Sequence, residues 1–273
     1  MRAFWFYAEF MKQARHITFD IITLFPEVLR PYCGVSILRR AQEKKLVTFA
    51  FYNPRDFAER RSRRTGGIPT SLSNVRKGAS GHRVVDGSPY GGGAGMVLKA
   101  EPVLAAVAEA MGGKGKGVPR TKAKVIILSA KGKQFSQNMA NDWAKKYERI
   151  VLVAGRYEGV DERVRIALKA EEVSIGPYVM TDGDVAAMAV VSAVARLVPG
   201  VIRLESLEEE SHVRAPVVRG ADGSGGGLEY PHYTRPEAFI WKGKTYRVPK
   251  VLLSGNHAEI NAWRSGKSRR ARG

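Results

Sequence analysis

Lys124-Val-Ile-Ile-Leu-Ser129 and Arg149-Ile-Val-Leu-Val-Ala154 are the two stretches that decide the fold class of this 273-residue chain. Each is a short apolar run followed by a turn that contains glycine, as buried parallel strands often are. The segment between them, Phe135–Tyr147, places aromatic and methionine side chains on one face at helical spacing. The two stretches therefore predict parallel strands joined by a helix.

Further strands and helices alternate on both sides of this unit. Ile17–Phe25 and Leu46–Tyr52 mix β-branched and apolar residues and predict strands, with one helix between them over Glu27–Lys45. Glu172–Ile175 predicts another short strand, and the alanine-rich segment Val185–Leu197 predicts a helix that ends before a Pro-Gly pair. This alternation predicts an α/β fold, with a mostly parallel sheet and helices on both faces.

The composition is typical of a folded protein from a reducing compartment. Hydrophobic residues make up 44% of the chain and charged residues 26%, which excludes disorder as the main state. Cys33 is the only cysteine, so neither an intramolecular disulfide nor a cysteine-based zinc cluster can form. No apolar run approaches the roughly 18 residues that a membrane-spanning helix needs. We therefore expect a cytoplasmic protein with no membrane partner.

The charge balance points to a polyanionic partner. The formal net charge is +19 and the pI is near 10.2, and such a field attracts nucleic acid. The bases are clustered, with eight of them against two acids between Arg55 and Arg83, and a second basic run over Lys267–Arg272. A solvated basic surface is the plainer explanation of the total charge, but it does not explain this clustering.

The length of the chain predicts two domains. Residues 1–15 are interpreted as an N-terminal extension, and residues 16–204 as the α/β domain, interrupted by a basic insertion at 62–80. Residues 205–227 carry acids and then glycines, which is typical of a flexible linker. Residues 228–273 form a smaller second domain.

Three turns that follow predicted strands are candidates for a ligand site, because open α/β sheets bind ligands beyond the carboxyl ends of their strands. These turns are residues 130–132, 155–159 and 176–183, and all contain glycine. Glycine lets the backbone approach a ligand closely, although the turn itself explains each glycine taken singly. The G-x-G-x-x-G fingerprint follows none of the predicted strands, which argues against a nicotinamide cofactor.

Five ordered strings carry a more specific signal: Ser88-Pro-Tyr-Gly-Gly-Gly-Ala-Gly-Met96, Gly155-Arg-Tyr-Glu-Gly-Val-Asp-Glu-Arg163, Glu172-Val-Ser-Ile-Gly176, Tyr230-Pro-His-Tyr-Thr-Arg-Pro236 and Val251-Leu-Leu-Ser-Gly-Asn-His-Ala-Glu259. Together they resemble the TrmD family of bacterial tRNA (guanine-N1)-methyltransferases, which belongs to the SPOUT class. The resemblance implies a deep trefoil knot, S-adenosylmethionine as cofactor, and a homodimer whose chains share each site. It implies methylation of guanine N1 in tRNA at position 37, next to the anticodon, and a shortened, mainly helical tRNA-binding domain at 228–273.

The resemblance also implies which residues contact each ligand. The cofactor would lie against Leu128, Ser129, Gly155, Tyr157, Glu158, Ile175, Gly176, Tyr178, Met180 and Gly183. The tRNA and its target guanine would lie against Pro89, Gly91, Gly92, Gly93, Arg156, His232, Arg235, Ser254 and Asn256. The resemblance implies magnesium as well, but no cluster of metal ligands in the sequence supports it, and no metal site is predicted.

The chemistry defines two further roles. Guanine N1 carries a proton and becomes a nucleophile only after losing it, so the reaction needs a general base. In the family this base is a linker acid within an acid-Ser-aromatic string, and Glu210 of Glu210-Ser211-His212 matches it; Glu208 and Glu209 are adjacent alternatives. Arg196 matches an arginine that would stabilise negative charge on O6, although an arginine at a helix C-terminus also offsets the helix dipole.

The chain departs from the family pattern at several points. Pro177 stands where the family usually has Asp, and Asp182 where it usually has Gly, both in the last cofactor turn. The insertion at 62–80, the longer linker and the stop at Gly273 are also unusual. Two alternatives therefore stay open: a catalytically impaired RNA-binding relative, and a SPOUT methyltransferase that acts on a ribose hydroxyl or another base.

Overall fold

The computed structural model describes residues 15–58, 83–112, 122–203 and 230–267. The chain divides into two compact units, Met1–Ile202 and Arg203–Gly273, and each is described by itself. None of the helices in these described ranges has the length and apolar character needed to cross a membrane.

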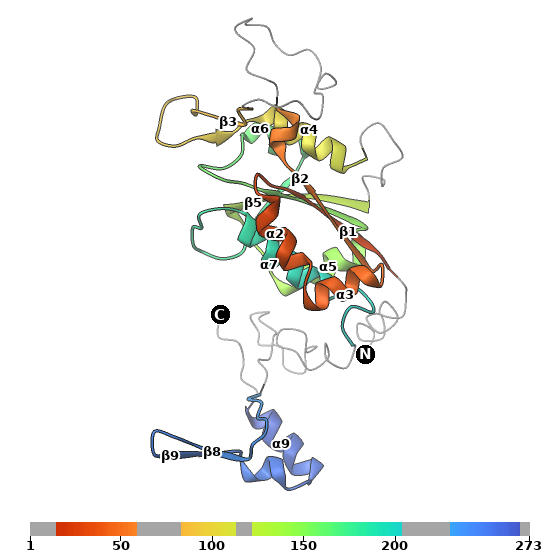
Figure 1. The fold of residues 1–273 in the computed structure, drawn as a ribbon, viewed down its shortest axis with the longest axis vertical. Helices are drawn as coiled ribbons and strands as arrows, with labels where there is room; N and C mark the ends of the chain where they lie inside the picture. Colours follow the sequence, from red (N-terminus) through yellow and green to blue (C-terminus); the bar gives the residue numbers. More distant parts are fainter. Residues whose placement is uncertain (1–14, 59–82, 113–121, 204–229, 268–273) are drawn as a thin grey trace, which may run out of the picture. The chain divides into compact units, whose positions relative to one another are not determined.

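The first unit is built on a five-stranded parallel sheet with the strand order β2-β1-β6-β5-β7 (Figure 1). All four pairs of neighbouring strands run parallel, which confirms the predicted α/β class. The strands are β1 (Ile17–Ile22), β2 (Val47–Tyr52), β5 (Ala123–Gln134), β6 (Arg149–Ala154) and β7 (Glu171–Ser174).

Helices cover both faces of this sheet, as the sequence predicts (Figure 1). On one face lie α4 (Ala100–Ala110), α6 (Glu162–Leu168) and the short 3-10 helix η1 (Pro54–Phe57). On the other lie α2 (Pro26–Cys33), α3 (Ser36–Glu43), α5 (Gln137–Lys146) and α7 (Asp184–Ala195). Successive side chains of β6 point to opposite faces, so Val151 and Val153 join the core under α4, while Ile150 and Leu152 are buried on the other face.

The single helix predicted over Glu27–Lys45 is wrong, because the chain forms two helices there. The first, α2, ends at Gly34, whose N–H donates to the carbonyls of Arg30 and Pro31. The next helix starts at Ser36, where the backbone φ is +50°. A residue with positive φ cannot continue a right-handed helix, so the apolar periodicity runs through a break that it does not reveal.

Strand β5 extends beyond the predicted end at Ser129, through a bulge. Leu128 and Lys133 both pair with Val173, so the intervening residues leave the ladder. Gly132 lies in this bulge, and a Cβ there would be 2.4 Å from the Val173 nitrogen and 2.5 Å from the Glu172 carbonyl carbon. Only glycine fits this close approach of two backbones.

We expect the substitution Gly132→Ala to destabilise the first unit, because the added methyl group overlaps backbone atoms that cannot rotate away. Overpacking of this kind costs about 1–3 kcal/mol. Thermal unfolding followed by circular dichroism should show a lower Tm than that of the unsubstituted chain. Gly87→Ala is the matched control, since a Cβ there meets only the Lys99 side chain at 3.4 Å. Equal Tm values for both variants would contradict the steric argument.

The second unit contains a β-hairpin that the sequence did not predict. Strands β8 (Ala238–Trp241) and β9 (Lys244–Arg247) pair antiparallel across Lys242-Gly243. Both turn residues have positive φ, +47° and +73°, as a two-residue type I′ turn requires. A 3-10 helix, η4 (Lys250–Leu253), and α9 (His257–Lys267) follow. The prediction of a mainly helical domain therefore omitted this hairpin.

Candidate functional site

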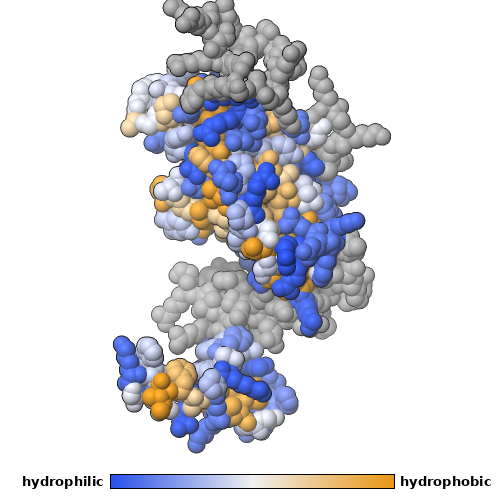
Figure 2. Space-filling model, viewed as in Figure 1, coloured by the Kyte–Doolittle hydropathy of each residue, from blue (hydrophilic) through white to orange (hydrophobic). Residues whose placement is uncertain are grey.

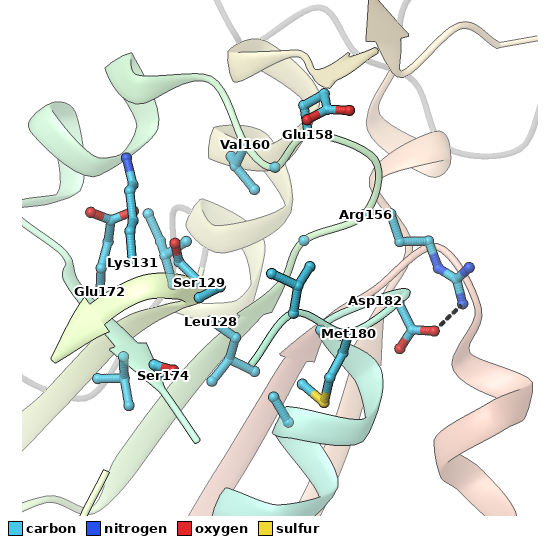
Figure 3. Close-up of a pocket in the computed structure, with 18 of the residues that line it drawn as sticks. Leu128, Ser129, Lys131, Arg156, Glu158, Val160, Glu172, Ser174, Met180 and Asp182 are labelled. Carbon is cyan, nitrogen blue, oxygen red and sulfur yellow. Dashed lines mark ion pairs between the residues drawn. The ribbon is translucent and has the colours of Figure 1, made fainter. Parts of the chain in front are cut away.

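The bulge within β5 and the turns that follow β6 and β7 come together at the carboxyl edge of the sheet. They line one pocket of about 370 Å³, within the size range of small-molecule sites. Leu128 and Ser129 lie in the middle of the view, with Lys131 and Glu172 on one side and Arg156 and Asp182 on the other (Figure 3). The convergence that the strand endings predicted is therefore present.

Backbone contacts join two of these turns directly. The Gly183 N–H donates to the Gly155 carbonyl over 2.8 Å, and Arg156 and Asp182 form an isolated antiparallel bridge. A Cβ on Gly183 would be 2.8 Å from the Gly155 nitrogen and 3.0 Å from the Ala154 Cα. The packing of the two turns thus requires glycine at 183. Main-chain atoms therefore form this side of the pocket.

The turn after β7 is folded back on itself. The Ser174 hydroxyl donates to the Gly176 carbonyl over 2.7 Å and accepts from the Gly176 N–H over 3.3 Å. The Tyr178 ring packs so closely on Gly176 that a Cβ there would be 2.2 Å from the ring. Tyr178 stays about half exposed and lines the pocket, so its ring offers a flat surface to a ligand.

The predicted cofactor residues gather at this pocket with one exception. Gly176 does not line the pocket but lies against the Tyr178 ring. The residues that do line it are Leu128, Ser129, Gly155, Tyr157, Glu158, Ile175, Tyr178, Met180 and Gly183. Their role in binding a cofactor stays a prediction, which their common location supports.

A group of charged side chains at the pocket was missed by the sequence reasoning. Lys131 Nζ lies 3.3 Å from a Glu172 oxygen and 3.8 Å from a Glu162 oxygen, and Arg165 pairs with Glu162 at 2.6 Å. All four residues line the pocket. They come from a bulge, a strand and a helix, so no single sequence string reveals them. These exposed pairs contribute little to stability but present both signs of charge to a ligand.

Arg156 is held on the opposite side of the pocket. Its guanidinium lies 3.0 Å from Asp184 and 3.4 Å from Asp182, and 4.2 Å from the Phe25 ring centroid. Asp184 is buried and also accepts a hydrogen bond from the Thr23 hydroxyl at 2.6 Å. Burial raises the pKa of Asp184, while these hydrogen bonds and the Arg156 charge oppose the increase. Arg156 is thus fixed in a position beside the pocket.

Asp182, one of the two departures from the family pattern, uses its side chain within the protein. One carboxylate oxygen accepts from the Asp184 N–H at 2.9 Å, at the start of α7, and the other faces Arg156. Figure 3 shows the carboxylate turned toward Arg156. Pro177, the other departure, is exposed.

The glycine-rich loop at 88–96 contacts one of the turns that line this pocket. Short strands β3 (Asp86–Gly87) and β4 (Val97–Leu98) close this loop. The Glu158 N–H donates to the Met96 carbonyl at 3.0 Å, which ties the loop to the turn after β6. Gly91, Gly92 and Gly93 all have positive φ, between 80° and 121°, a conformation that favours glycine. The loop that includes Pro89 is therefore placed next to the predicted cofactor residues.

Arg196 lies far from the pocket of its own chain. It caps the C-terminal end of α7, whose first turn lines the pocket, and a 12-residue helix is about 18 Å long. The following Gly200 packs against Leu46, directly before β2 begins. Arg196 is thus near the amino edge of the parallel sheet, while the pocket is at the carboxyl edge.

The other predicted residues lie elsewhere. Glu210 and its alternatives, Glu208 and Glu209, fall outside the described residues. In the second unit, His232 and Arg235 are exposed, and the His232 ring packs on Tyr230 at 4.7 Å.

Ser254 and Asn256 have structural uses at the start of α9. The Asn256 side chain accepts from the N–H groups of Ala258 and Glu259, at 3.1 and 3.4 Å. Ser254 accepts from the Asn256 N–H at 3.1 Å. Such bonds stabilise a helix N-terminus, so these two side chains are explained without RNA.

The fold and pocket define a class of protein: an α/β protein with a pocket of small-molecule size at the carboxyl ends of a parallel sheet. Within this class, the family model described as tRNA (Guanine-1)-methyltransferase TrmD matches residues 17–71 and 68–272 of the chain. The chain belongs to this family, which confirms the resemblance carried by its five sequence strings.

Curated relatives give the same result. Over 252 residues the chain is 43% identical to the tRNA (guanine-N(1)-)-methyltransferase of Dehalococcoides mccartyi strain CBDB1, covering 92% of this chain and 85% of the relative. The protein of that name from Chloroflexus aggregans is 45% identical over 246 residues, covering 90% and 80%. That of Carboxydothermus hydrogenoformans is 42% identical over 250 residues, covering 91% and 81%. The similarity thus extends across both units.

Proposed function

We propose that this chain transfers a methyl group from S-adenosylmethionine to N1 of a guanine in tRNA, at position 37 next to the anticodon. The observation that carries the proposal is the pocket where the bulge of β5 and the turns after β6 and β7 meet. Family membership supplies the reaction, and the names of the relatives support tRNA as substrate.

The pocket lining fits S-adenosylmethionine. Leu128, Ile175 and the Tyr178 ring offer apolar and flat surface for an adenine, and Gly155 allows close approach of the backbone. Lys131 and Glu172 offer charges of both signs for the zwitterionic amino-acid end. When bound, the cofactor supplies an electrophilic methyl group on a sulfonium. Positioning of the two reactants then provides much of the rate.

Two residues of the chain act on the guanine. Glu210 removes the proton from N1, and a carboxylate can do this when its surroundings raise its pKa toward neutrality. The Arg196 guanidinium stabilises the negative charge that the lost proton leaves on O6. The described residues hold no group of three or more His, Cys, Asp or Glu side chains placed for a metal.

A homodimer with shared sites explains the position of Arg196. Because this residue is at the opposite edge of the sheet from its own pocket, it would complete the pocket of a second chain. Apolar side chains around α2 and α3 are exposed, namely Val28, Tyr32, Val35 and Ile37. These give a surface that a second copy can cover. The deep trefoil knot, the cytoplasmic location and the domain bounds 16–204 and 228–273 belong to the same proposal.

Mass spectrometry of an unmodified tRNA transcript tests the proposal. After incubation with the protein and labelled S-adenosylmethionine, we expect one labelled 1-methylguanosine, in the nuclease fragment next to the anticodon. A transcript with adenine at position 37 is the control and should stay unlabelled. Label on a ribose or another base would favour another SPOUT activity. Failure to bind S-adenosylmethionine in calorimetry would favour the impaired RNA-binding relative.

A further inference from the structure

The hairpin β8–β9 presents an exposed aromatic face. The register pairs Phe239 with Tyr246 and Trp241 with Lys244. Cross-strand partners and alternate residues of one strand share a face, so these four side chains lie on the same side. The Phe239 and Tyr246 rings stack at 5.4 Å with an interplanar angle of 17°. Phe239, Trp241 and Tyr246 are 55%, 62% and 41% exposed.

This face is also cationic. Lys244 Nζ lies 5.5 Å from the Tyr246 ring centroid, and Lys242 Nζ lies 5.9 Å from that of Trp241. Arg247 pairs with Ala238 and therefore lies on the other face, while Lys250 follows the hairpin and the sequence has no Asp or Glu between Glu237 and Glu259. Figure 2 shows hydrophobic surface directly beside strongly hydrophilic surface on this unit. The hairpin therefore combines flat rings with uncompensated positive charge.

This combination fits nucleic acid better than protein. The centres of protein–protein interfaces are depleted in lysine, but Lys244 stands among the rings here. Sites for unpaired nucleic acid combine aromatic side chains, on which bases stack, with cations that follow the phosphates. A paired helix keeps its bases stacked inside, so exposed rings suit the unpaired nucleotides of a loop.

We propose that the β8–β9 hairpin binds unpaired nucleotides of the tRNA substrate. Trp241 and the Phe239–Tyr246 pair stack on bases, and Lys242 and Lys244 contact the neighbouring phosphates. This inference rests on the proposed function for tRNA as the ligand, but it assigns residues other than those that line the methyl-transfer pocket.

Equilibrium binding of tRNA to the full-length chain tests the hairpin. Trp241→Ala and Tyr246→Ala should each raise the Kd by about 5- to 150-fold, which corresponds to about 1–3 kcal/mol per stacked base. Lys242→Gln and Lys244→Gln should each lower the slope of log Kd against log salt by about 1, as expected when one phosphate contact is lost. Ile240→Ala is the matched control, because Ile240 is 73% exposed and lies on the other face of the same hairpin; it should bind like the unsubstituted chain.

Several results would overturn the inference. The first is wild-type affinity in both aromatic variants, and the second is an equal loss in Ile240→Ala. The third is a change from dimer to monomer in the sedimentation of Trp241→Ala, which would assign the face to a second copy. A single-stranded RNA should show the aromatic effect and a fully paired duplex should not; equal losses on both would exclude stacking. The binding measurement does not depend on turnover. A chain that binds tRNA without methylating N1 would therefore refute the proposed function, while the hairpin inference could still be tested.

Discussion

Glu210→Gln is expected to lower the turnover of tRNA methylation by about 10²- to 10⁴-fold, the usual contribution of a general base. The amide has nearly the same shape as the carboxylate but cannot accept the N1 proton, so guanine stays a poor nucleophile. Single-turnover incorporation of labelled methyl groups measures this loss. The Kd for S-adenosylmethionine, measured by calorimetry, should stay unchanged, because the substitution affects the proton transfer alone.

The neighbouring acids provide the controls for this variant. Glu208→Gln and Glu209→Gln remove the same charge from the same segment and should retain most of the turnover. If one of them shows the large loss and Glu210→Gln does not, that neighbouring glutamate is the general base in place of Glu210. If all three turn over normally, no carboxylate of this segment removes the proton, and an activity on another RNA position gains support.

A mixture of two inactive variants is expected to recover activity. Arg196→Ala removes the guanidinium that stabilises O6, and Ser129→Trp fills the pocket that Ser129 lines. In a mixed dimer, the open pocket of the first chain meets the intact Arg196 of the second. Random pairing of equal amounts makes about half of the dimers mixed, each with one working site, so about a quarter of wild-type activity should return. Methyl incorporation before and after subunit exchange measures this recovery.

The mixture also separates the two possible arrangements of the site. If each chain used its own Arg196, both sites of a mixed dimer would be defective and no activity would return. Calorimetry on Ser129→Trp alone should show lost S-adenosylmethionine binding with an unchanged circular dichroism spectrum. A fully active Arg196→Ala variant would instead show that Arg196 has only a structural role at the C-terminal end of α7.

The parallel sheet could be predicted from sequence because most of its strands are short runs of apolar and β-branched residues that end before a glycine or a proline. The split between α2 and α3 could not, since the apolar periodicity continues across Gly34, while the extended backbone of Val35 and the positive φ of Ser36 break the helix. The extension of β5 was missed for a related reason. Its residues after the bulge are polar, and they pair with β7 through their backbones. The hairpin had a signal that was overlooked, in the Lys242-Gly243 turn between two short runs of β-forming residues.

The residues of the candidate site that lie at strand ends could be predicted from sequence. Those that tertiary packing brings together could not. Most of the predicted cofactor residues line one pocket because parallel strands end at a common edge. The ion pairs around Lys131 join elements that are distant in sequence, so no local pattern reveals them. The distance of Arg196 from the pocket follows from the length and direction of α7, which a sequence motif does not contain.

The backbone hydrogen bond between Gly183 and Gly155 has an evolutionary consequence. Since these turns meet through main-chain atoms, this contact between them does not depend on which side chains the neighbouring residues carry. Asp182 bonds to the start of α7 and faces Arg156, and Pro177 faces solvent. Residues 177 and 182 can therefore differ between relatives without breaking this contact, provided that Gly183 is kept, because a Cβ there would lie 2.8 Å from the Gly155 nitrogen.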